Sequence, residues 1–188
     1  MANDYLDVSG SGAMVSGSVS QDSLYEEAAE VYSPALNRLA QAYEFDPEAR
    51  RDLLQEIHLQ LWRSFTNFDQ RCSLRTWVYR VAHNVATAYV LRQSRIRGRL
   101  VSMEEIEEAA GQDAELAASN THALERLSAL IRSLKPLDRQ IIVSYLEGMD
   151  AGSIGEITGL SAGNIAMKVH RIKNVLKRQF HEGGGHGE

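Results

Sequence analysis

Apolar residues recur every three or four positions along most of this chain, with polar residues between them. The period is clearest from Pro47 to Phe65, where it predicts a helix with one apolar stripe. That stripe consists of Leu53, Ile57, Leu61 and Phe65. Similar helical stretches begin near Ser23, run from about Leu74 to Arg95, and resume at Ala123. Since no useful length of the sequence alternates apolar and polar residues, the pattern predicts an all-α protein.

Composition divides this helical pattern into two units. We predict two small helical domains joined by a flexible linker. The expected boundaries are a disordered tail at 1–22, a domain at 23–99, an acidic linker at 100–122, a second domain at 123–181 and a Gly-rich tail at 182–188. Ser23 is expected to cap the first helix. Asp46 is expected to cap the second helix, with Pro47 in its first position.

Charge is segregated along the chain, although its net value is −5. Residues 71–100 hold seven arginines and no acid, residues 103–115 hold six acids and no base, and residues 164–180 hold five basic residues and no acid. The net charge argues against a nucleic-acid-binding protein, but the two acid-free basic segments favour one. The single cysteine, Cys72, excludes a disulfide framework and a zinc site built from four cysteines.

The N-terminus and the longest apolar runs indicate where in the cell the protein is expected. The first 20 residues lack the basic start and apolar stretch of a secretory signal. No apolar run approaches the ~20 residues that a membrane-spanning helix needs. We therefore expect a cytoplasmic protein that does not insert into a membrane.

The segment from Ile154 to Ile165 has the spacing of a helix-turn-helix. Gly155 is a small residue where two helices touch, Gly159 tolerates positive φ in the turn, and Ile165 closes the core. Ser161 is placed to cap the second helix and leave its N–H groups facing a phosphate. The residues expected to be buried on that helix are Ile165, Val169, Ile172 and Leu176.

The opposite face of that second helix is basic, which is what docking into the major groove of DNA requires. It carries Met167, His170, Arg171, Asn174 and Arg178, with Asn164 and Lys168 at its margin. The competing interpretation is an ordinary helical hairpin with a basic surface. Spacing and charge together favour DNA binding.

With both halves considered, the chain resembles the sigma-70 family, specifically the small extracytoplasmic-function sigma factors. These keep only region two and region four, joined by a flexible linker. The resemblance covers roughly residues 25–180. In the first half it rests on Asp52–Ile57, Leu61–Trp62 and Thr76–Asn84. In the second half it rests on Leu134–Arg139, Leu146–Gly148 and Gly163–Arg171.

The resemblance implies a protein that binds core RNA polymerase and directs promoter recognition, DNA melting and transcription initiation, with no catalytic residue, cofactor or metal of its own. Region two would grip the β′ clamp helices through Asp52, Gln55, Glu56 and Arg63. It would bind the −10 element through Asn67, Phe68, Arg71, Arg75, Tyr79, Arg80, His83, Asn84 and Arg92, with the loop at Asn67–Leu74 holding a flipped base. Region four would touch the β flap and read the −35 element through Ser161, Asn164, Met167, Lys168, His170 and Arg171. An anti-sigma partner is also expected, because small sigma factors are commonly held inactive by one.

Two positions depart from the family pattern. Ala166 stands where Lys or Arg is frequent, so the −35 preference of relatives does not transfer to this chain. Gly155 stands where Ala is usual. Because glycine inside a helix costs roughly 0.5–1 kcal/mol, the second domain is expected to be less stable.

Three other classes of protein compete with this interpretation. A helix-turn-helix regulator that acts without polymerase has no need of the Asp52–Glu56 face or the Thr76–Asn84 helix. An enzyme of DNA or RNA processing needs clustered carboxylates, a metal set or an activated nucleophile. The acids here lie mainly in the expected linker. A pure interaction module leaves the two basic segments unexplained.

Overall fold

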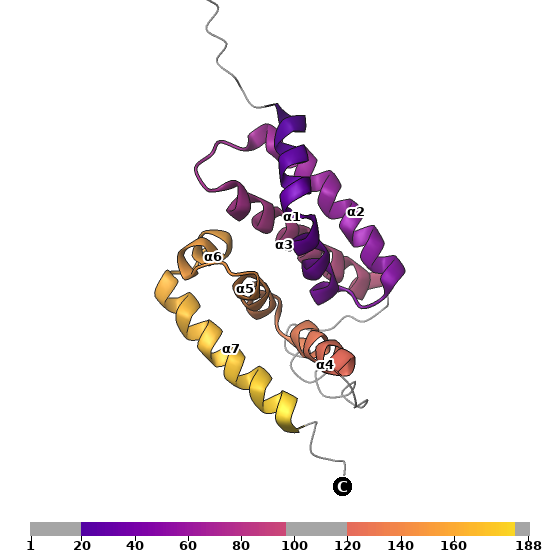
Figure 1. Ribbon diagram of the computed structural model, residues 1–188, viewed down its shortest axis with the longest axis vertical. Helices are drawn as coiled ribbons and strands as arrows, with labels where there is room; N and C mark the ends of the chain where they lie inside the picture. The colour runs from indigo at the N-terminus through magenta and orange to yellow at the C-terminus, as the bar shows by residue number, and fades with distance from the viewer. Residues whose placement is uncertain (1–19, 97–119, 183–188) are drawn as a thin grey trace, which may run out of the picture.

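Helices make up the chain in the computed structural model, which describes residues 20–96 and 120–182 (Figure 1). The elements are α1 (Gln21–Tyr43), α2 (Pro47–Ser64), η1 (Phe65–Asn67), α3 (Leu74–Ile96), α4 (Asn120–Ser133), α5 (Pro136–Leu146), α6 (Ala151–Thr158) and α7 (Ala162–Glu182). No strand occurs within these two ranges, and the all-α prediction is confirmed. The expected tails and acidic linker lie mainly outside the described residues.

Helices α1, α2 and α3 pack against one another and form the first unit. The predicted stripe of α2 is buried, since Leu53, Ile57 and Leu61 have no exposed surface. Leu36 and Leu39 of α1 are equally buried. Closely spaced aliphatic side chains on both helices therefore build the core of this unit.

The helix starts are set by side chains that accept backbone N–H groups. Asp46 accepts the N–H of Ala49 at 2.8 Å, as expected, and Pro47 occupies the first turn of α2. The expected cap of α1 at Ser23 is wrong: the Ser20 hydroxyl accepts the N–H of Ser23 at 3.1 Å, and α1 begins at Gln21. Both serines suit a cap, and the cap at Ser20 lengthens the helix by three residues, 21 to 23.

Helices α4 to α7 form the second unit. The predicted inner face of α7 is confirmed, because Ile165, Val169, Ile172 and Leu176 are all buried. α5 and α6 lie between α7 and the first unit (Figure 1). The outer helix α7 is thus held by its apolar face, and its opposite face is left toward solvent.

The turn of the helix-turn-helix shows why two glycines are needed. Gly159 has φ of 77°, and its N–H donates to the Gly155 carbonyl at 2.8 Å. A methyl group on Gly155 would lie 2.6 Å from the Leu160 carbonyl oxygen. The expectation that Gly155 weakens this unit is therefore wrong, since the close approach of the two backbones at the turn requires it.

We predict that Gly155→Ala lowers the free energy of unfolding by about 1–3 kcal/mol, because the Leu160 backbone must move to admit the methyl group. Gly163→Ala is the matched control: it lies in α7 with nothing within 4 Å of the added carbon, and it is expected to stabilise by roughly 0.5–1 kcal/mol. Urea unfolding of both variants measures the difference. A Gly155→Ala protein as stable as the Gly163→Ala protein contradicts this account of the turn.

Candidate functional site

The outer face of α7 gathers most of the residues expected to read the −35 element. Asn164, Met167, His170 and Arg171 are exposed on it. The Ser161 hydroxyl accepts the N–H of Asn164 at 3.3 Å and caps the helix. The face is thus polar and basic on a helix that is anchored from behind, which suits insertion into a major groove.

One acid of α5 organises the basic residues of this face. The Asp138 carboxylate accepts one hydrogen bond from Lys168 at 2.8 Å and another from Arg171 at 3.3 Å. The Lys168 side chain is only 27% exposed, whereas that of Arg171 is 65% exposed. Lys168 therefore serves largely inside the second unit, and Arg171 is the more available of the two cations.

The face of α2 expected to meet polymerase is largely open. Asp52, Gln55 and Arg63 are exposed. Glu56 instead pairs with Arg92 of α3, with 2.6 Å between the closest atoms. Sequence reasoning assigned these two residues to different partners, polymerase and DNA, yet here they neutralise each other.

The end of η1 and the loop that leads from it to α3 carry three of the expected −10 contacts. Asn67 and Arg71 are exposed, and Arg71 pairs with Asp69 at 3.0 Å. Phe68 is half-buried, with its ring centroid 5.3 Å from that of Trp77. Phe68 thus helps to pack the loop against α3.

Two α3 residues expected to line DNA are covered by the second unit. Tyr79 is 1% exposed and His83 is fully buried. Asn84 is exposed. In this arrangement of the two units, therefore, Tyr79 and His83 are out of reach of DNA.

The two arginines of α3 nearest these residues also contact the second unit. Arg75 donates to the backbone carbonyl of Glu147. Arg80 donates to the backbone carbonyl of Glu156 at 3.0 Å. Helix α3 therefore meets α5 and α6 through its basic side chains as well as through buried ones.

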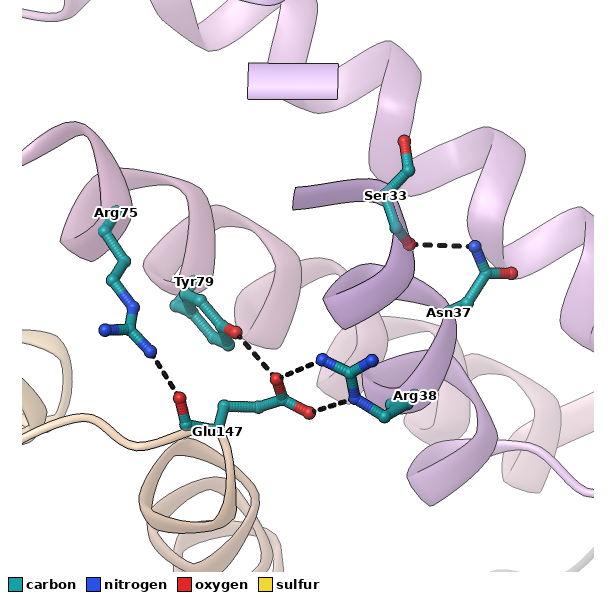
Figure 2. Close-up of polar contacts among 6 residues, drawn as sticks. All are labelled: Ser33, Asn37, Arg38, Arg75, Tyr79 and Glu147. Atoms are coloured by element: carbon teal, nitrogen blue, oxygen red, sulfur yellow. Dashed lines mark hydrogen bonds and ion pairs between the residues drawn. The ribbon is translucent and has the colours of Figure 1, made fainter. Parts of the chain in front are cut away.

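Glu147, which follows the last residue of α5, is the most connected residue between the units (Figure 2). Its carboxylate accepts Nε and Nη2 of Arg38, both at 2.7 Å. It also accepts the Tyr79 hydroxyl at 3.3 Å. Burial and the neighbouring Glu147 charge raise the pKa of Tyr79 to about 12. The hydroxyl therefore stays protonated and keeps its capacity to donate.

His83 forms the buried polar link of the same contact. Its Nδ1 lies 2.9 Å from the Tyr43 hydroxyl, and its Nε2 lies 3.0 Å from the Ser144 hydroxyl. Burial lowers the pKa of His83 to about 3. The histidine is consequently neutral.

This burial predicts a pH dependence with a definite sign. The His83 pKa is lower in the folded chain than its ordinary value of 6.5, so the stability it contributes is present above pH 6.5 and is lost as pH falls toward 3. Between pH 7.5 and 5.5 the loss is about 1.4 kcal/mol. Burial lowers the pKa of His58 as well, which acts in the same direction. Urea unfolding at the two pH values measures the loss.

The exposed His170 supplies the control for that experiment. His170→Gln should leave the pH dependence intact, and His83→Gln should reduce it. Equal stability of the unaltered chain at pH 7.5 and pH 5.5 would show that His83 is not held neutral by burial.

Residues 20–96 and 120–182 contain neither a candidate metal site nor a candidate membrane span. No three His, Cys, Asp or Glu side chains lie close enough together in these ranges to hold a metal ion. No helix there combines the length and apolar character needed to cross a membrane.

Sequence reasoning missed the contact between the units. Arg38 and Ser144 were not singled out, and Glu147 was noted only within the Leu146–Gly148 motif. Helical periodicity marks residues that face an apolar core, and it carries no signal for a polar pair 109 positions apart such as Arg38 and Glu147.

Comparison with known families gives two matches. Family models described as sigma-70 region 2 and sigma-70 region 4 match residues 28–96 and 124–176, respectively. The first match lies in the first unit and the second match in the second unit. Together they cover more than half of the chain.

Individual relatives agree with these matches. The ECF RNA polymerase sigma factor SigX of Bacillus subtilis is 24% identical over 140 residues, covering 72% of each chain. The ECF RNA polymerase sigma factor SigE of Mycolicibacterium smegmatis is 24% identical over 161 residues, which span 60% of that protein.

Solved structures share the fold. The sigma factor RpoE of Bartonella quintana, in complex with the anti-sigma factor NepR, superposes with a TM-score of 0.60 at 20% identity, over 82% of this chain and 94% of that one. CnrH in complex with the cytosolic domain of CnrY gives 0.60 at 18% identity, over 87% and 90% of the two chains.

Proposed function

The chain belongs to the extracytoplasmic-function group of the sigma-70 family, and we propose that it binds core RNA polymerase and directs it to promoters. The observation that carries this proposal is the pairing of two units in one chain. One matches region 2 and the other matches region 4 with an exposed basic helix. A chain that only binds DNA needs the second unit alone.

In this proposal, each unit takes one promoter element. The α7 face reads the −35 element, with Arg171 suited to a bidentate contact with guanine and Ser161 to a phosphate at the helix start. The loop at 67–73 and the basic residues of α3 hold the melted −10 strand, because unstacked bases need polar or aromatic pockets and the backbone needs a basic track. The α2 face with Asp52 grips the β′ clamp helices, and the second unit touches the β flap.

The chain itself performs no covalent chemistry in this scheme. Its contribution is to position polymerase and to capture melted DNA, so it acts in the cytoplasm, where polymerase and DNA are found. An anti-sigma partner is part of the proposal. Both solved neighbours described above are complexes, one of them named as a sigma factor with its anti-sigma factor.

Size-exclusion chromatography of the full chain with purified core polymerase tests the proposal. The expected result is co-elution of the chain with polymerase. A chain that binds duplex DNA but never co-elutes with polymerase would instead be a helix-turn-helix regulator acting on its own.

A further inference from the structure

Two side chains of the first unit converge on the Glu147 carboxylate, and a third reaches the backbone carbonyl of the same residue (Figure 2). Arg38 of α1 presents two nitrogens, each 2.7 Å from an oxygen of Glu147. The Tyr79 hydroxyl of α3 lies 3.3 Å from one of the same oxygens, and Arg75 donates to the backbone carbonyl of this residue. A planar guanidinium fork with a hydroxyl beside it is a donor set that binds carboxylate and phosphate equally well.

The carboxylate that fills this cluster is supplied by the other unit. The Glu147 side chain is only 11% exposed, whereas the Arg38 side chain that pairs with it is 59% exposed. The residue directly follows the last residue of α5, and Gly148 after it has φ of 76°. Both the side chain and the main chain of Glu147 are thus held by the first unit.

The cluster lies on the face of α3 that the proposed function assigns to promoter DNA. Arg75 and Arg80 of this helix both contact the second unit, and residues 71–100 contain no acid. An acid-free basic helix is a track for a nucleic-acid backbone. A DNA phosphate would satisfy the same donors as the Glu147 carboxylate does.

Further contacts between the units lie around the same part of α3. His83 bonds to Ser144, Arg80 bonds to the Glu156 carbonyl, and Arg132 donates to the Gln41 carbonyl at 3.2 Å. While these contacts hold, α5 and α6 cover Tyr79 and His83. A DNA strand and the second unit cannot occupy this surface together.

We propose that Arg38, Tyr79 and Arg75 form a phosphate-binding site for the −10 strand, and that Glu147 occupies this site as an internal competitor until DNA or polymerase separates the two units. The inference rests on the proposed function and adds Arg38 to the DNA-binding surface. It also gives Glu147 a role in limiting DNA binding by the free chain.

The first test is a comparison of Glu147→Ala with the unaltered chain. We expect the variant to bind a mixed-sequence 20-nucleotide single-stranded DNA about tenfold more tightly by fluorescence anisotropy. We also expect its radius of gyration in small-angle X-ray scattering to increase. Glu156→Gln is the matched control, since it removes an exposed charge of α6 whose backbone carbonyl, and not its carboxylate, makes the contact between the units. An affinity and a radius equal to those of the unaltered chain would overturn the competitor role.

A second comparison isolates the phosphate site. The Arg38→Ala/Glu147→Ala chain and the Glu147→Ala chain both lack the bond between the units, so a difference in DNA binding reports Arg38 alone. We expect about tenfold weaker binding in the double variant, and a salt dependence reduced by about 0.7, the slope that one single-stranded phosphate contact contributes. Equal affinity and slope in the two chains would overturn the phosphate site.

These outcomes are separable from the proposed function. A chain that fails to co-elute with core polymerase would refute the sigma role and leave the DNA affinities of these variants unaffected. Unchanged DNA binding by Glu147→Ala would refute the competitor and leave polymerase binding in place.

Discussion

Asp52→Arg is expected to lower the affinity of the chain for core RNA polymerase by about 100-fold. Asp52 is exposed on α2, and in the described part of the chain its carboxylate makes no hydrogen bond or ion pair. Reversing its charge should therefore leave the fold intact. If the proposed polymerase face is correct, the substitution places like charges against each other in the complex, which costs several kcal/mol.

The control for this variant is Glu26→Arg, which makes the same charge change on the exposed side of α1. Titration of fluorescently labelled chain with core polymerase measures both affinities. Glu56 is unsuitable for the experiment, because reversing it would also break its pair with Arg92 inside the first unit. Equal affinities of the Asp52→Arg and Glu26→Arg chains would remove Asp52 from the polymerase interface.

Arg171→Ala is expected to reduce initiation at promoters that depend on a −35 element by about 10- to 100-fold, the range for a lost bidentate contact to a base. The loss should be specific to DNA, because Lys168 remains within 2.8 Å of Asp138 and keeps that partly buried acid paired. Polymerase binding should be unchanged. Run-off transcription and co-elution measure the two properties on the same protein.

Lys177→Ala provides the control on the same helix. Lys177 is exposed one and a half turns beyond Arg171, and its loss removes the same charge. A small, sequence-independent reduction is expected from it, as for a phosphate contact. If Arg171→Ala and Lys177→Ala reduce initiation equally at every promoter, Arg171 does not read a base.

The second unit shows what the sequence alone was able to predict. Its apolar residues repeat with a helical period, and Ile165 and Ile172 are buried as that period requires. Gly159 adopts the positive φ expected for the turn. These features depend on residues close in sequence, where periodicity and backbone preference act directly. The spacing also predicts the need for a small residue at position 155, and the structure shows the contact that requires it, with the Leu160 carbonyl across the turn.

In the first unit, the sequence pattern did not predict which polar side chains are buried. Tyr79 and His83 are polar side chains on a basic helix and were expected to face DNA, yet both are buried against α5. The docking of one unit on the other contributes to this burial, because His83 bonds to Ser144 and Tyr79 bonds to Glu147. That contact depends on pairs distant in sequence, such as Arg38 with Glu147 and His83 with Ser144. Such pairs are fixed by tertiary geometry, which no local pattern encodes.

With the two units packed together, the two proposed promoter-reading surfaces are exposed to different extents. The Arg171 side chain remains 65% exposed on α7. The α3 surface around Tyr79 is covered until the units part. The free chain should therefore present its −35 surface before its −10 surface, and polymerase binding would be the event that separates them.

Run-off transcription with purified core polymerase on a promoter library tests the central claim most directly. The account predicts transcripts from a defined subset of promoters when the full chain is added, and none from those promoters with core polymerase alone. The absence of any chain-dependent transcript, with circular dichroism showing the chain to be folded and helical, would contradict the assignment of this protein as a sigma factor.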